Sequence, residues 1–115
     1  DDPDLNAMLG LLLEAQGYIC RRLDRGDAVL ETVREFRPQV VLLDVELPGK
    51  SGYFLCWALK SSPETRDTLV VLMSAKSKES DQKLGIAMQA DAYVTKPFEM
   101  ADLTSIMQLL LDRPG

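Results

Sequence analysis

The chain has 115 residues, of which 46% are hydrophobic and 27% charged, values that are ordinary for one globular domain with a buried core. Its net charge of −5 argues against a domain that grips nucleic acid, because phosphate contacts require a basic face. No stretch has the length of a membrane span or the pattern of a signal peptide, so we expect a cytoplasmic domain without membrane contact.

Helix and strand patterns alternate along the first half of the chain. Residues 4–16 place apolar side chains at helical spacing, and residues 18–23 have the composition of a less buried strand. Residues 27–36 predict an amphipathic helix that ends before Pro38. Residues 39–44 form an apolar, mostly branched run, which is typical of a strand covered on both faces.

The alternation continues to the end of the chain. Helices are predicted at residues 51–62, 78–89 and 100–113. A second doubly buried strand is predicted at residues 69–74, and a short strand at 92–95. There is no internal repeat, low-complexity tract or linker, so we expect one domain.

Strands that alternate with helices predict an α/β fold with a parallel sheet, right-handed crossovers and helices on both faces. In such sheets the functional residues gather at the carboxyl ends of the strands. Three of the predicted strands carry polar residues at their carboxyl ends, namely Asp44, Ser74 and the pair Thr95-Lys96. We expect these side chains to point into one crevice.

One strand is missing from the pattern. The pattern begins with a helix, whereas a parallel sheet of this kind begins with a strand. The runs at 39–44 and 69–74 are too apolar for exposed edges, so each requires neighbours on both sides. We therefore expect a further strand upstream of Asp1 in the parent protein, or the same strand supplied by another chain.

The segment Gly49-Lys50-Ser51 resembles the end of a phosphate-binding P-loop, but its spacing is wrong. A P-loop requires a glycine five residues before Gly49, and that position holds Asp44, an anion where phosphates would sit. Pro48 also removes one backbone donor. Asp44 must therefore be explained as a carboxylate.

The absence of histidine excludes Ser-His and Cys-His catalysis, His-ligated zinc and a role as phosphohistidine carrier. Cys20 and Cys56 are far apart and lie inside apolar segments. We expect both cysteines to be small buried side chains in a reducing compartment, and not to form a disulfide or bind a metal as a pair.

Four segments, in order and spacing, resemble the receiver domain of two-component response regulators, the CheY-like superfamily. They are DDPDLNAMLGLLLEAQGY, VVLLDVELPGKSG, VVLMSAKS and DAYVTKPF. The resemblance covers nearly the whole chain. It implies a flavodoxin-like, doubly wound, five-stranded parallel sheet of order 2-1-3-4-5, with residues 1–115 forming a receiver domain that lacks its first strand.

The resemblance also assigns roles to residues. Asp44 corresponds to the phosphoacceptor, Ser74 to the hydroxyl residue after the fourth strand and Lys96 to the site lysine. Tyr93 corresponds to the switch aromatic. An aromatic residue in a short strand more often packs in the core than acts as a switch. Lys96-Pro97 resembles the cis peptide bond of the family.

The family binds Mg²⁺, and the corresponding ligands are Asp1, Asp44 and the backbone carbonyl of Glu46. Two carboxylates about 4 Å apart repel by roughly 4 kcal/mol at an effective dielectric of about 20, so apposing Asp1 and Asp44 requires a cation. Mg²⁺ suits such an all-oxygen site. Asp2 would occupy the neighbouring position and cap the first helix.

The implied function is a phosphorylation-dependent switch. A phosphohistidine on a sensor histidine kinase or phosphotransfer protein would donate to Asp44, and Ser74 and Tyr93 would rearrange the surface of the fourth helix, fifth strand and fifth helix for a downstream effector. The domain would catalyse only its own phosphorylation and dephosphorylation. Dimerisation stays open.

Two other functions are compatible with this fold. One is a receiver-like interaction module that takes no phosphate. The other is a small flavin-binding protein, which would require a phosphate-binding loop where this chain has the anionic sequence DDPD. The sequence departs from many family members at Gln89-Ala90, where they have Gly-Ala, so we expect the end of the fourth helix to be shaped differently.

Overall fold

The computed structural model describes residues 28–45, 51–75, 79–96 and 98–112. The predicted helix at 4–16 and strand at 18–23 lie outside these residues. The additional first strand stays a prediction.

Seven elements follow one another in the described part of the chain. Their bounds agree with the predicted segments to within about two residues. They are α2 (Val29–Phe36), β1 (Val40–Asp44), α3 (Gly52–Ser61), β2 (Leu69–Ser74), α4 (Glu79–Ala87), β3 (Ala92–Thr95) and α5 (Met100–Leu111).

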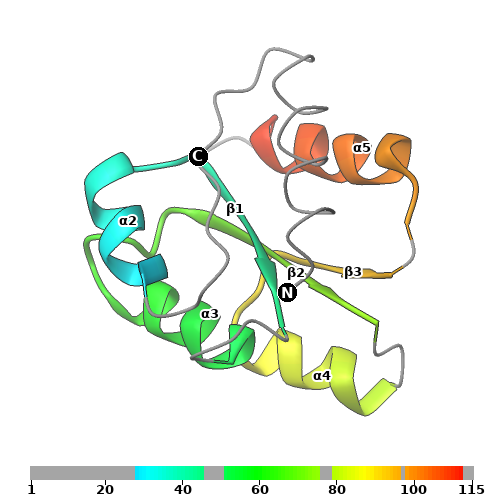
Figure 1. The fold of residues 1–115 in the computed structure, drawn as a ribbon, viewed down its shortest axis with the longest axis horizontal. Helices are drawn as coiled ribbons and strands as arrows, with labels where there is room; N and C mark the ends of the chain where they lie inside the picture. The colour runs from blue at the N-terminus through cyan, green and yellow to red at the C-terminus, as the bar shows by residue number, and fades with distance from the viewer. Residues whose placement is uncertain (1–27, 46–50, 76–78, 97, 113–115) are drawn as a thin grey trace.

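The three strands form a parallel sheet in the order β1-β2-β3 (Figure 1). Val40 pairs with Leu69 at one end of the β1–β2 ladder and Asp44 with Met73 at the other. This order corresponds to the last three strands of the predicted 2-1-3-4-5 sheet. The α/β fold with a parallel sheet is therefore confirmed.

Helices cover both faces of the sheet, with α3 and α4 on one side and α5 on the other (Figure 1). Because side chains alternate along a strand, β2 contributes to both cores. The α3-side core consists of Val29, Val33, Leu43, Val45, Leu55, Cys56, Leu59, Val70 and Leu72. The α5-side core consists of Val71, Met73, Val94, Leu103, Met107 and Leu110.

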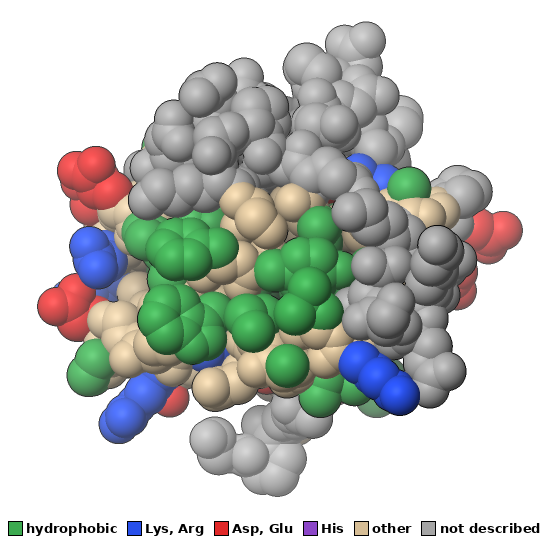
Figure 2. All heavy atoms as spheres, turned by 90° about the horizontal axis from the view of Figure 1, so that it is seen from below, with side chains coloured by type: hydrophobic (Ala, Val, Ile, Leu, Met, Phe, Trp, Pro, Cys, Tyr) green, Lys and Arg blue, Asp and Glu red, His purple; other side chains and the backbone are tan. Residues whose placement is uncertain are grey.

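The outer surface of α3 and α4 carries exposed apolar side chains, which gather on the face in Figure 2. Phe54 and Trp57 of α3 are each about half exposed, and their ring centroids lie 6.1 Å apart. Leu84 and Ile86 of α4 are also exposed. Trp57, the single tryptophan of the chain, can therefore serve as a fluorescent reporter on this side of the sheet.

Helix α4 ends in a left-handed turn without glycine. Gln89 has φ 70°, its N–H bonds to the Ile86 carbonyl at 2.9 Å, and the Ala90 N–H bonds to the Gly85 carbonyl at 3.1 Å. These are the two hydrogen bonds of a Schellman motif. The expectation that Gln89 would alter the end of this helix was wrong for the described backbone, since Gln89 adopts the conformation that glycine would supply.

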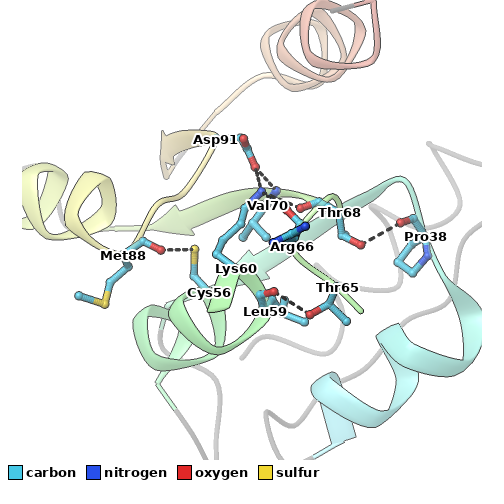
Figure 3. A network of polar contacts seen from close by, with 10 residues as sticks. All are labelled: Pro38, Cys56, Leu59, Lys60, Thr65, Arg66, Thr68, Val70, Met88 and Asp91. Atoms are coloured by element: carbon cyan, nitrogen blue, oxygen red, sulfur yellow. Dashed lines mark hydrogen bonds and ion pairs between the residues drawn. The ribbon is translucent and has the colours of Figure 1, made fainter. Parts of the chain in front are cut away.

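The amino ends of the strands are held together by a buried polar network around Lys60 of α3 (Figure 3). Its ammonium lies 2.6 Å from Asp91 Oδ2 and donates to the Thr68 carbonyl at 2.8 Å. Asp91 also accepts from the Val70 N–H at 2.8 Å. The network thus connects α3, the start of β2 and the residue before β3.

Cys56 is a buried free thiol whose Sγ donates to the Met88 carbonyl at 3.4 Å (Figure 3). Burial raises the pKa of this thiol to about 11, so it stays protonated and unreactive at neutral pH. The interpretation of Cys56 as a small buried side chain is confirmed. Cys20 lies outside the described residues.

Among the described residues, no helix combines the length and the apolarity that crossing a membrane requires.

We predict that Lys60→Met destabilises the fold by about 3–5 kcal/mol, because it leaves the mostly buried Asp91 carboxylate without its counter-ion. The measurement is the free energy of unfolding from urea titration. Arg34→Met is the matched control, since Arg34 pairs with Glu64 at the exposed surface, and it should change stability by less than about 0.5 kcal/mol. Equal losses in the two variants would contradict the role given to Lys60.

Candidate functional site

The carboxyl ends of the strands bring three polar residues to one edge of the sheet. Asp44 is the last residue of β1, Ser74 the last of β2, and Lys96 follows β3. The ladder continues past the strand ends, because the Val45 N–H donates to the Met73 carbonyl at 2.9 Å and the Lys96 N–H to the Ser74 carbonyl at 2.7 Å. The sequence prediction had placed these three residues together, and the structure does so.

Asp44 and Lys96 form an ion pair across this edge. The Lys96 ammonium donates to Asp44 Oδ2, and the two side chains are 17% and 9% exposed respectively. Burying a carboxylate to this extent costs free energy unless a cation lies beside it. Lys96 is therefore a partner of the carboxylate and not an ordinary surface lysine.

Ser74 is fully buried, and its backbone carbonyl holds the N–H of Lys96. Displacement of the end of β2 would therefore also displace the residue that carries the ammonium. Ser74 lies between the other two residues in the ladder, which links its position to theirs.

Gly52, the first residue of α3, fixes the backbone that carries Asp44. A Cβ at Gly52 would lie 2.6 Å from the Asp44 carbonyl oxygen and 2.7 Å from Val45 Cα, closer than real contacts allow. The Gly52 N–H also bonds to the Val45 carbonyl at 3.1 Å. Only glycine lets α3 begin so close to Asp44.

Tyr93 lies half buried against the α3-side core, and its hydroxyl is 3.2 Å from that of Tyr53 on α3. The sequence prediction singled out Tyr93 and missed Tyr53. Nothing in the sequence pattern relates two residues forty positions apart, so only the structure reveals this contact.

The other predicted ligands, Asp1 and Glu46, lie outside the described residues, as do Asp2 and Pro97. Within the described ranges there is no group of three or more His, Cys, Asp or Glu side chains that could hold a metal ion. Asp44 itself is a hard oxygen donor of the class that Mg²⁺ prefers. It therefore fits one position of the predicted ligand set, and the remaining ligands stay predictions.

This arrangement presents a carboxylate beside an ammonium group at the edge of a rigid sheet. A carboxylate can act as a nucleophile toward phosphorus, and a fixed cation next to it stabilises negative charge on the group being transferred. The site thus places a carboxylate and a charge-neutralising ammonium group side by side.

The family model of the response regulator receiver domain matches residues 1–108. The phosphate regulon transcriptional regulatory protein PhoB of Rhizobium meliloti (strain 1021) is 35% identical over 113 residues, which are 98% of this chain and 50% of PhoB. The BeF3-activated receiver domain of Klebsiella pneumoniae RstA has a TM-score of 0.91 at 28% identity, covering 98% of this chain and 94% of that one.

A third likeness is to the receiver domain of the sensor histidine kinase PA1611 of Pseudomonas aeruginosa PAO1, whose structure holds a magnesium ion in the active-site cleft. It has a TM-score of 0.89 at 21% identity, covering 98% of this chain and 93% of that one. These likenesses confirm the flavodoxin-like fold. The chain spans about half the length of the curated relatives it matches.

We predict that Gly52→Ala destabilises the protein by about 2–3 kcal/mol, because the added methyl group meets backbone atoms that cannot rotate away. Gly85→Ala is the matched control. Its added methyl would meet only side chains, at 3.0 Å or more, so it should cost clearly less. Urea unfolding of both variants measures the difference. A Gly52→Ala protein as stable as the wild type would show that α3 does not press on the Asp44 backbone.

Proposed function

Because the chain belongs to the family of response regulator receiver domains, we propose that it is a phosphorylation-dependent signalling switch in which Asp44 accepts a phosphoryl group. The donor is a phosphohistidine on a sensor histidine kinase or phosphotransfer protein. The observation that carries the proposal is the ion pair of the largely buried Asp44 carboxylate with Lys96 at the carboxyl edge of the sheet.

The reaction is an in-line transfer in which the protein supplies positioning and electrostatic stabilisation. An Asp44 oxygen forms the new bond to phosphorus while the P–N bond to the donor imidazole breaks, and the electron pair of that bond remains on the imidazole nitrogen. The Lys96 ammonium neutralises negative charge on the transferring oxygens. The domain catalyses only this transfer and the later hydrolysis of its own phosphoaspartate.

Mg²⁺ would be held by the carboxylates of Asp1 and Asp44 and by the Glu46 backbone carbonyl. When bound, the ion supplies further neutralisation of phosphoryl charge. Support comes from the oxygen donor of Asp44 and from the magnesium ion in the PA1611 receiver domain. Lys96 and the ion would then together offset the repulsion between the Asp44 carboxylate and the negatively charged phosphoryl group.

The output of the switch begins at Ser74. Its hydroxyl donates to a phosphoryl oxygen on Asp44, which draws the end of β2 inward and raises the population in which the Tyr93 ring lies toward α3 and α4. The surface of α4, β3 and α5 changes with it and is recognised by an effector. The direct bond from the Lys96 N–H to the Ser74 carbonyl supports this coupling.

The partners are a kinase upstream and an effector downstream, in the cytoplasm. PhoB is named as a transcriptional regulatory protein, and the chain corresponds to half of it. An effector domain that acts on transcription therefore fits this family, whereas the receiver domain itself, with its net charge of −5, does not bind nucleic acid.

We predict that acetyl phosphate with Mg²⁺ adds the mass of one phosphoryl group to the wild-type protein and none to Asp44→Asn, because the amide is not a nucleophile. Intact-mass spectrometry makes the measurement. Asp102→Asn, which changes an exposed carboxylate on α5, is the matched control and should be labelled like the wild type. Label on Asp44→Asn would overturn the assignment. No label on any variant would favour the unphosphorylated interaction module.

We predict that Ser74→Ala accepts phosphate to nearly the wild-type level but loses most of the conformational response, because the hydroxyl that senses the phosphoryl group is gone. Phosphorylation is followed by intact mass and the response by Trp57 fluorescence. Ser61→Ala, at the exposed end of α3, should keep both. A full fluorescence response in phosphorylated Ser74→Ala would refute the role of Ser74.

A further inference from the structure

The Tyr93 ring occupies a defined seat between α3, α4 and β2. Its register partner on the neighbouring strand is Leu72, which belongs to the α3-side core. Its hydroxyl meets that of Tyr53 on α3 at 3.2 Å. The ring is thus held by its strand at one end and by a hydrogen bond at its tip.

Gly85 forms the α4 wall of this seat. A Cβ at Gly85 would lie 3.0 Å from Tyr93 Cδ2, 3.4 Å from Leu72 Cδ1 and 3.5 Å from Tyr93 Cε2. Helix α4 therefore lies close against the ring at Gly85, and a side chain at this position would require the ring to shift slightly. We call the surroundings of the ring formed by Tyr53, Leu72 and Gly85 the Tyr93 seat.

The hydrogen bond between Tyr53 and Tyr93 does not involve the Asp44 side chain. Tyr53 belongs to α3, and its bond to Tyr93 lies on the side of the sheet that faces α3 and α4, whereas Asp44 lies at the end of β1. Hence this bond stabilises the seated ring whether or not Asp44 carries a phosphoryl group. One such hydrogen bond shifts a two-state equilibrium by about two- to twelvefold.

We propose that Tyr53 is a positioning residue that holds Tyr93 in its seat and so sets the balance of the switch before phosphorylation. This inference rests on the proposed function, in which the phosphorylated state has the Tyr93 ring turned toward α3 and α4. This role of Tyr53 requires the seated ring to be the less populated state in solution before phosphorylation. Whatever favours the seated ring then favours binding of a phosphoryl group or its analogue by the same factor, because the two equilibria are linked.

The test is titration of the whole chain with beryllofluoride and Mg²⁺, in which the midpoint of the Trp57 fluorescence change gives the dissociation constant. Tyr53→Phe should bind about two- to twelvefold more weakly than the wild type, because the seated state has lost its hydroxyl partner. Thr104→Val removes a hydroxyl from α5 on the other side of the sheet, and it should bind like the wild type.

A double-mutant cycle separates this bond from a general loss of stability. Tyr93→Phe removes the same bond from the other side and should weaken binding by a similar factor. The double variant should bind no more weakly than the weaker single variant, because the bond can be lost only once. Effects that multiply in the double variant would overturn the proposal. Urea unfolding checks that every variant is folded under the conditions of the titration.

The outcomes distinguish the two proposals. If the wild type does not bind beryllofluoride, the phosphoacceptor function fails and the role of Tyr53 fails with it. If the wild type binds and Tyr53→Phe binds equally well, the phosphoacceptor function stands and the role of Tyr53 is refuted.

Discussion

The ion pair between Asp44 and Lys96 is the interaction on which the site depends. A carboxylate that is 9% exposed needs a cation, and the sheet supplies one from the residue that follows β3. The two partners are 52 residues apart in the sequence, and only the parallel order β1-β2-β3 brings them together. The strand β2 between them contributes the Met73 and Ser74 carbonyls that fix both backbones. The Asp44 carboxylate is therefore positioned by the same hydrogen-bonded ladder that builds the sheet.

The opposite edge of the sheet carries a second buried ion pair with a different character. Lys60 contacts Asp91 and also donates to backbone carbonyls, and Asp91 accepts from the N–H of Val70. Such a network is bound to the main chain on several sides, so it holds α3 and two strands in place. The pair at the carboxyl edge lies where α/β sheets bind ligands. The pair of Lys60 and Asp91 thus holds one end of the sheet in place, and the pair of Asp44 and Lys96 lies at the end where we propose phosphoryl transfer.

The sequence was sufficient to predict most of the fold and the meeting of Asp44, Ser74 and Lys96. Branched apolar runs mark buried strands, and the ends of parallel strands share one edge, so a linear pattern fixes that arrangement. It could not predict contacts that depend on how elements pack. The Tyr53–Tyr93 bond and the close approach of Gly52 to Asp44 follow from helix positions that no local pattern encodes. The ligand roles of Asp1 and Glu46 remain predictions from the family resemblance.

The left-handed turn at Gln89 has a consequence for how α4 moves. A residue with a side chain pays roughly 1–2 kcal/mol to adopt this conformation, and that energy is released when the end of the helix unwinds. Gly85, inside the same helix, lowers its intrinsic stability by about 1 kcal/mol relative to alanine. Both features lower the local stability of α4, so we expect amide hydrogen exchange to be faster in this helix than in the buried strands.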